Sequence, residues 1–187
     1  MQQNYAALTA VIVGLIIAAL ALWLVLRNRR RKHLSSRFGP EYDHTVAELG
    51  KGRAERELEA RTKRVEKLTI HPLPAAERDR FLDLWRRAQA LFVDSPLTAV
   101  AEADRLIGEV MRARGYPVSD FERRAADVSV DHPRVVANYR EAHAIALNAD
   151  KGQAGTEELR QAMVHYRALF EELLEAHERE PEPAVAH

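Results

Sequence analysis

The sequence predicts an all-α protein with an N-terminal transmembrane helix, a charged spacer helix and a C-terminal bundle of about five helices. Three observations indicate this class. Residues 6–26 form an uncharged apolar run, and apolar residues recur at three- and four-residue spacing from residue 75 to residue 174. No stretch alternates apolar and polar residues between turn signals, as a half-buried strand would. With 187 residues, the chain has room for an anchor and one compact domain.

The apolar run Ala6–Leu26 has the length of a membrane-spanning helix. At about 1.5 Å per residue, roughly 20 apolar residues cross the ~30 Å hydrocarbon core of a bilayer. Residues 1–5 carry no basic side chain, and arginines stand where a signal peptide would be cleaved. We therefore predict a retained anchor and not a cleaved signal.

Basic residues follow the apolar run at once and indicate its cytoplasmic side. Residues 1–5 are then a short extracytoplasmic tail, and the C-terminal domain is cytoplasmic. The basic cluster also attracts anionic lipid, by about 1 kcal/mol per residue near the surface. The predicted membrane-interface residues are Trp23, Arg27, Arg29, Arg30, Arg31 and Lys32.

The charge of the chain is unevenly distributed. Six of the 28 basic residues and none of the 28 acidic ones precede Glu41, so the remainder carries a net charge of −6. Phosphate backbones repel such a domain, so we predict no nucleic acid partner. The chain has no cysteine, which excludes disulfides, a thiol nucleophile and Cys-ligated zinc.

Two segments are predicted to connect the anchor to the domain. Residues 27–52 form a basic juxtamembrane linker, because the pair Gly39-Pro40 interrupts weak periodicity. Residues 53–70 form a charged, solvated spacer helix with a narrow apolar stripe. A short coiled coil that pairs two chains through this stripe is the alternative. The stripe consists of Ala54, Leu58, Val65 and Leu68.

The predicted bundle occupies residues 73–177, and proline, glycine and capping residues divide it into helices. Asp131 and Thr156 are expected to cap the two last helices, and residues 178–187 form a disordered tail. Phe81, Trp85 and Phe92 are core residues, with a partner groove as the alternative. The expected helices are 75–93, 96–114, a short one from the capping box Ser119–Glu122 to about 128, one to about 149, and one from 156.

Histidines, arginines and one tyrosine at helix ends are weak candidates for interaction. Two arginines and an aromatic ring end one helix, which suits an anionic group, and one histidine lies in a fixed turn. The same residues also suit ordinary helix ends and boundaries. The candidates are Arg112, Arg114, Tyr116, His132, His143 and His165.

The sequence contains no catalytic, phosphate-binding or metal-binding motif. We therefore predict no enzyme activity, no catalytic or cofactor-binding residue, no metal and no cofactor. The alternative is a histidine and carboxylate site in the bundle, should the last two helices bring His143 and His165 together. Its members would be Glu141, His143, His165 and Glu172.

Several segments resemble those of a bacterial family of uncharacterised single-span membrane proteins. They are residues 36–43, 110–117, 129–133 and 162–170. The resemblance implies a tethered helical domain in a bacterial inner membrane and no assigned activity. We predict a protein-interaction or scaffold module that contacts the lipid bilayer and binds a protein partner or a second copy of itself. Recognition of anionic lipid or a nucleotide by the basic segment and the Arg112 and Arg114 corner is the alternative.

Overall fold

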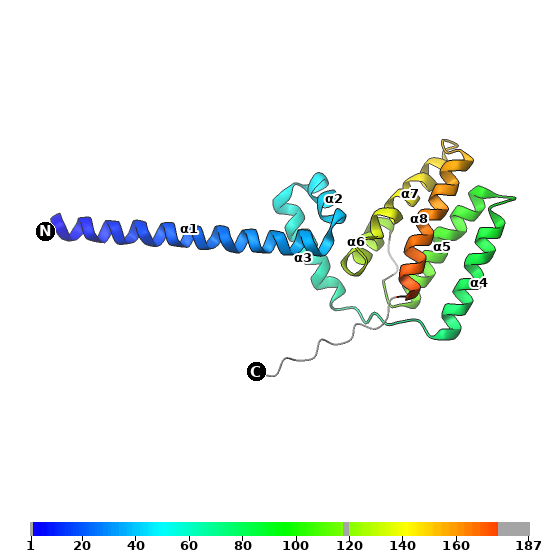
Figure 1. Cartoon of the computed structure of the whole chain (residues 1–187), viewed down its shortest axis with the longest axis horizontal. Coiled ribbons are helices and arrows are strands. Elements are labelled where there is room, and N and C mark those ends of the chain that lie inside the picture. The colour runs from blue at the N-terminus through cyan, green and yellow to red at the C-terminus, as the bar shows by residue number, and fades with distance from the viewer. Residues whose placement is uncertain (1, 118–119, 176–187) are drawn as a thin grey trace.

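The computed structural model describes residues 2–117 and 120–175, with side chains described from Ile17 onward. These residues form eight helices and no strand, which confirms the all-α class. Figure 1 shows one long helix projecting from a group of shorter helices.

The long helix α1 (Gln2–Phe38) extends about 55 Å at 1.5 Å per residue. Its N-terminal part stands clear of the other helices (Figure 1). The helix becomes buried only at Leu34 and Phe38, where it contacts α2, α3 and α6. Before that point its large apolar side chains are at least 50% exposed: Ile17, Leu20, Leu22, Trp23, Leu24, Val25 and Leu26.

Within the part of the chain that the structure describes, no helix is both long enough and apolar enough to cross a bilayer. Residues 6–16 of the predicted span lie outside the residues whose side chains are described. The span therefore stays a prediction. The predicted disordered tail, residues 178–187, also lies outside the described residues.

The predicted linker over residues 27–52 is wrong, because helices occupy most of it. Helix α1 continues to Phe38, and α2 (Pro40–Leu49) follows after the single residue Gly39. Gly39 has a φ of 50°, which glycine adopts readily, and proline suits the first position of a helix. The Gly-Pro pair therefore changes the direction of a helical chain and does not open a linker.

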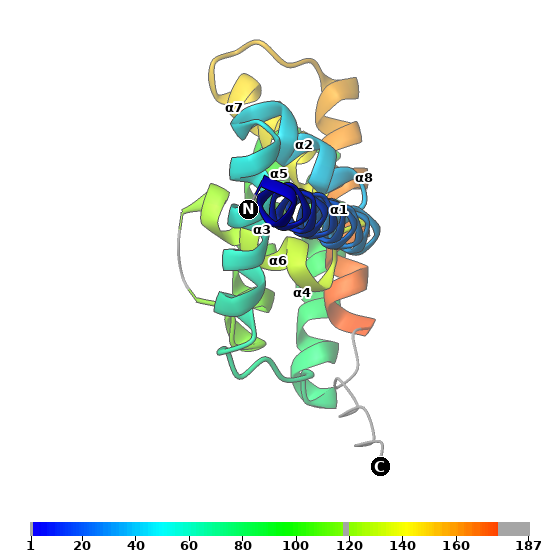
Figure 2. The same ribbon diagram turned by 90° about the vertical axis from the view of Figure 1, so that its left-hand side faces the viewer.

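Helix α3 (Lys51–Val65) covers most of the spacer helix predicted over residues 53–70, but it ends at Val65 and one face of it is buried, not solvated. Its stripe of Ala54, Leu58 and Val65 is at most 1% exposed, because α3 packs against α2 and α6. A coiled coil between two chains would need this stripe on the surface, where it does not lie. Figure 2 looks along α1 and shows α2, α3 and α6 around its C-terminal end. Their shared second core consists of Leu34, Phe38, Tyr42, Leu58, Val65 and Val130.

Residues 73–177 contain five helices in their described part, the number that the sequence predicts. Helix α8 packs along both α5 and α7, and α4 packs on α5. The rings of Trp85 and Phe170 stack with centroids 4.6 Å apart, and Phe81 is 1% exposed, so two of the three predicted core aromatics are buried. The helices are α4 (Ala75–Leu91), α5 (Pro96–Ala113), α6 (Phe121–Asp131), α7 (Val136–Asp150) and α8 (Thr156–Glu175).

Two predicted helix starts differ from the structure. Asp131 does not cap α7 but is the last residue of α6, and a turn separates it from Val136. The run of small and apolar residues before it continues α6 for one turn beyond the predicted end. Thr156 is the first residue of α8 and not its cap. At α6 the N-cap is Asp120, which accepts a hydrogen bond from the Arg123 amide at 2.9 Å, and Ser119 lies outside the described residues.

Candidate functional site

Three of the six weak candidates come together at one end of the bundle. Arg114 and Tyr116 follow α5, and His132 follows α6, so the two helix ends meet there. Helix α8 adds a carboxylate from the other side. We call this group the Arg114 cluster: Arg114, Tyr116, Asp131, His132 and Glu172.

Arg114 is 4% exposed and lies between three segments of the chain. Its Nη1 donates to the carbonyl oxygen of Leu173 at 3.2 Å and to Nε2 of His132 at 3.3 Å, and its Nε donates to the carbonyl oxygen of His71 at 3.4 Å. Burial is the largest cause that lowers the pKa of Arg114, and the charges of Tyr116 and Glu172 oppose it. The buried guanidinium is therefore held mainly by neutral acceptors.

The hydrogen bonds of His132 assign its tautomer. A guanidinium only donates, so Nε2 of His132 accepts from Arg114, and the ring proton is on Nδ1. Nδ1 then donates to Oε1 of Glu172 at 3.1 Å. Burial lowers the pKa of His132 below its ordinary value of 6.5, and the charge of Arg114 lowers it further, although the hydrogen bond to Glu172 raises it. The ring is thus kept neutral.

The Arg114 cluster works as a connection between helices. Tyr116 donates to Oδ2 of Asp131 at 3.0 Å, which joins the residues after α5 to the end of α6. Arg114 and His132 join α5 and α6 to α8. Since both side chains are at most 6% exposed, a substrate has little access to either of them. The geometry indicates a structural connection between the ends of α5, α6 and α8.

The remaining weak candidates lie apart from this cluster. Arg112 is exposed on α5. The His143 ring stacks on Phe121 with centroids 3.5 Å apart, and burial lowers its pKa, whereas His165 faces Glu141 at 3.1 Å. The last two helices are neighbours as expected, but each histidine has its own partner. Among the described residues, no group of three metal-ligating side chains gathers.

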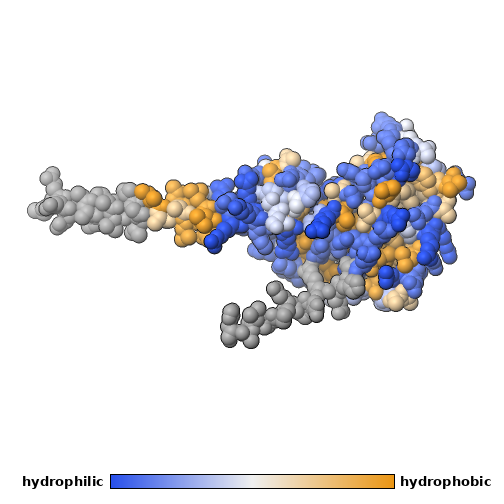
Figure 3. Space-filling view, viewed as in Figure 1, coloured by the Kyte–Doolittle hydropathy of each residue, from blue (hydrophilic) through white to orange (hydrophobic). Residues whose placement is uncertain are grey.

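The predicted membrane-interface residues lie on α1 where its apolar surface ends. Figure 3 shows the described apolar surface of α1 giving way to a hydrophilic band before the domain. The guanidinium of Arg27 lies 5.0 Å from the ring centroid of Trp23, and Arg30 forms an ion pair with Glu59 of α3. Arg29, Arg31 and Lys32 are exposed on the same stretch of helix.

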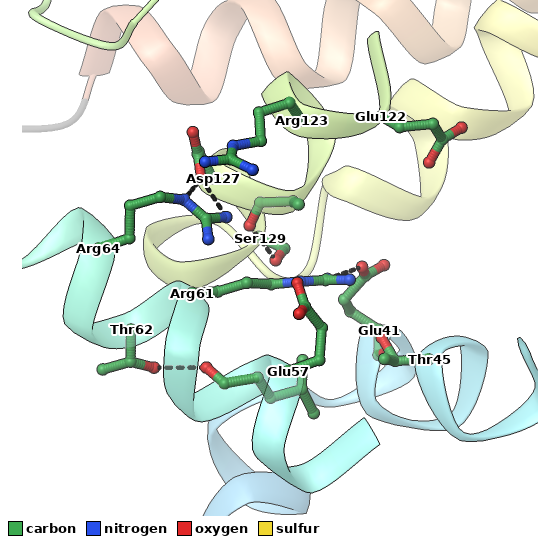
Figure 4. Close-up of polar contacts among 12 residues, drawn as sticks. Glu41, Thr45, Glu57, Arg61, Thr62, Arg64, Glu122, Arg123, Asp127 and Ser129 are labelled. Atoms are coloured by element: carbon green, nitrogen blue, oxygen red, sulfur yellow. Dashed lines mark hydrogen bonds and ion pairs between the residues drawn. The ribbon is translucent and has the colours of Figure 1, made fainter. Parts of the chain in front are cut away.

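A buried ionic network that the sequence does not predict connects α2, α3 and α7. The Glu41 side chain is 1% exposed, and it accepts from Arg61 at 2.7 Å and from Arg140 at 3.0 Å. Figure 4 shows Arg61 reaching Glu41, and nearby Arg64 of α3 meeting Asp127 of α6. Burial lowers the pKa of Arg140, but its carboxylate partners outweigh burial and raise it overall. Only the tertiary fold reveals this network, because its members are far apart in the sequence.

A shallow groove lies between α4 and α8, on the side of the bundle away from the projecting α1 (Figure 1). Its volume is about 210 Å³. Apolar side chains and two arginines line it, and Val164 is 47% exposed. The α4–α8 groove is lined by Gln89, Phe92, Arg160, Met163, Val164 and Arg167.

In comparisons with known proteins, no family model, no curated protein and no solved structure matches this chain. The family resemblance noted from the sequence therefore stays a prediction.

Proposed function

We propose that this protein is a single-pass protein of a bacterial inner membrane, with its N-terminus outside and its helical domain in the cytoplasm, where the domain binds a protein partner. The observation that carries the proposal is the uncovered apolar surface of α1. Seven large apolar side chains between Ile17 and Leu26 are at least 50% exposed on a helix that leaves the domain. A large apolar surface of this kind marks a site that lipid or another protein covers.

The residues after this surface support the orientation. Five cations between Arg27 and Lys32 stand at its C-terminal end, and the residues before it carry no charged side chain. Basic flanks are retained in the cytoplasm during insertion. From Leu26 to the first buried residue, Leu34, the helix rises about 12 Å at 1.5 Å per residue. The domain then lies close to the lipid head groups. It is not held away from the membrane surface by a spacer.

The α4–α8 groove supports a protein as the partner. Its volume of about 210 Å³ is below the roughly 300–1,000 Å³ of small-molecule pockets but suits one or two partner side chains. The flanking Arg160 and Arg167 pair with Glu157 and Glu171 of the same helix, so the exposed apolar side chains, and not free charge, favour a protein partner. A membrane anchor raises the local concentration of both proteins, so a small interface is sufficient.

Photo-crosslinking in intact cells tests the binding of a partner at the α4–α8 groove, and a reporter at the C-terminus tests the membrane topology. A crosslinker at Val164 is expected to capture a partner or a second copy, which the mass of the product distinguishes. A crosslinker at Asp79, exposed elsewhere on α4, is expected to capture none. Val164→Asp in a protein with the crosslinker at Gln89 should remove the product, whereas Leu147→Asp, at a site of similar exposure, should not. No product at Val164, or a C-terminal reporter found outside the cytoplasm, would overturn the proposal.

A further inference from the structure

The fold brings the start of α3 back beside α1 at the level where the apolar surface of α1 ends. A groove with a volume of about 340 Å³ lies between the two helices. Helix α1 supplies an apolar wall and two cations, and α3 supplies a third cation. The main lining side chains are Trp23, Leu26, Arg27, Arg30, Glu55 and Arg56.

The charge of this groove is positive and only partly neutralised. Three arginines and one glutamate line it. Arg30 is paired with Glu59, but within the described part of the chain neither Arg27 nor Arg56 forms an ion pair. Arg27 instead lies over the Trp23 ring at 5.0 Å. An anion that enters the groove therefore meets two guanidinium groups that form no ion pair, with the Glu55 carboxylate and an apolar surface beside them.

The position of Arg56 is what distinguishes a binding site from an orientation signal. Retention of the flank in the cytoplasm requires only basic residues that follow the span directly, and Arg27 to Lys32 meet that need. Arg56 comes from another helix and reaches this level only because α2 and α3 fold back. Because the tertiary fold places Arg56 at the level of Arg27 and Arg30, the three side chains can contact one anionic ligand there.

We propose that this groove binds the head-group phosphate of an anionic phospholipid, with the acyl chains along Trp23 and Leu26. The inference rests on the proposed membrane anchor. A helix from Ala6 to Leu26 is about 31 Å long and matches the ~30 Å hydrocarbon core, which places Arg27, Arg30 and Arg56 in the head-group layer. The apolar wall continues into the span, so a lipid fits the groove better than a free phosphate does. Its volume of about 340 Å³ lies within the range of small-molecule pockets, roughly 300–1,000 Å³.

Tryptophan fluorescence of the full chain in proteoliposomes tests the proposal. The protein has two tryptophans, and Trp85 is buried in the bundle, so brominated acyl chains report on Trp23 alone. Brominated phosphatidylglycerol is expected to quench Trp23 more strongly than brominated phosphatidylcholine at equal mole fraction. Arg56→Gln should lower the relative affinity for phosphatidylglycerol about fivefold, the equivalent of ~1 kcal/mol per basic residue. Arg53→Gln, an exposed change on the same helix outside the lining, should leave it unchanged.

Each other outcome has a definite meaning. Equal quenching by the two lipids, or equal effects of the two substitutions, overturns the lipid site while leaving the anchor intact. Quenching by neither lipid shows that Trp23 is not at a bilayer, and then the proposed anchor itself fails. Inorganic phosphate added at constant ionic strength is expected to leave the excess quenching unchanged. If it removes the excess, the groove binds a soluble phosphate and the lipid assignment is wrong.

Discussion

Arg140 of α7 donates a hydrogen bond to Glu41 of α2 at 3.0 Å, although the two residues are 99 positions apart in the sequence. Arg61 of α3 donates to the same carboxylate at 2.7 Å. One buried anion therefore holds two cations from different parts of the chain. It joins α2 and α3, which pack against the end of α1, to the bundle that carries the α4–α8 groove.

Removing the charge of Glu41 should destabilise the domain strongly. Glu41→Gln leaves two largely buried arginines without their anion, and breaking a buried ionic group in this way costs about 3 kcal/mol or more. Glu122→Gln is the matched control, because Glu122 also pairs with Arg140 but has a 72% exposed side chain. We expect it to change the free energy of unfolding by about 1 kcal/mol or less. Denaturant unfolding of both full-length variants in detergent gives the comparison, and equal losses would contradict it.

The Arg114 cluster should make stability depend on pH. The pKa of His132 is lower in the folded chain than its ordinary value of 6.5, so the unfolded state binds the proton more readily. Its contribution to stability is therefore full above about pH 6.5 and is lost as the pH falls through the folded-state pKa. The unfolding temperature measured by circular dichroism is expected to fall by a few degrees between roughly pH 7 and pH 5.

His132→Asn should remove the part of the pH dependence of the unfolding temperature that arises from protonation of the His132 ring. The variant has a lower unfolding temperature at neutral pH, because the bridge between Arg114 and Glu172 is shortened, but a flatter profile toward acid. His33→Asn, at an exposed position on α1, should keep the profile of the original chain. An unchanged slope in His132→Asn would assign the acid sensitivity to other groups.

Gly115 should tolerate no side chain. Its φ is +97°, and a Cβ at this position would lie 2.3 Å from the carbonyl oxygen of Thr69, which is backbone and cannot rotate away. Gly115→Ala is expected to lower the free energy of unfolding by about 3 kcal/mol. Gly152→Ala has a similar φ of +71° but open space, so only the backbone strain of about 1 kcal/mol should remain. Similar losses in the two variants would mean that the close approach to Thr69 carries no cost.

Two buried tyrosines should respond in opposite directions to loss of the hydroxyl. Tyr166 donates to Oδ1 of Asp104 at 3.2 Å, whereas the Tyr139 hydroxyl has no hydrogen-bond partner in the described part of the chain. Tyr166→Phe should destabilise the domain by about 1 kcal/mol, and Tyr139→Phe should be neutral or stabilising by a similar amount. A loss of stability in both variants would indicate that the Tyr139 hydroxyl finds a partner in solution.

The bundle was predictable from the sequence because its helices carry wide apolar faces with clear breaks between them. Pro96 and Gly115 mark the ends of α5 in both the sequence and the structure, and the Asp120 cap lies one residue from the predicted one. The helices over residues 27–52 were not predictable, and for α3 the sequence predicts the helix but not its burial. These helices bury few apolar residues each, so local periodicity is weak, and their second core forms only in the folded chain.

The candidate site was predictable in part. The sequence predicts Arg114, Tyr116 and His132 as candidates because they lie at helix ends, where segments distant in sequence meet. Glu41 gave no local signal, because an acidic residue after Gly39-Pro40 also suits an ordinary helix start. Its burial depends on two arginines supplied by other helices. Ionic partners of this kind follow from the tertiary arrangement and not from spacing.

Helix α1 contains no glycine or proline between Gly14 and Gly39, and its last turns are fixed by the second core. The helix is therefore continuous from its apolar surface to the turns that pack against α2, α3 and α6. A change in the tilt or rotation of α1 would then be passed on to the helices that pack against its C-terminal turns, and through them to the bundle. In the proposed membrane orientation, the bilayer would thus set the direction in which the α4–α8 groove faces, and membrane thickness would influence the proposed partner binding.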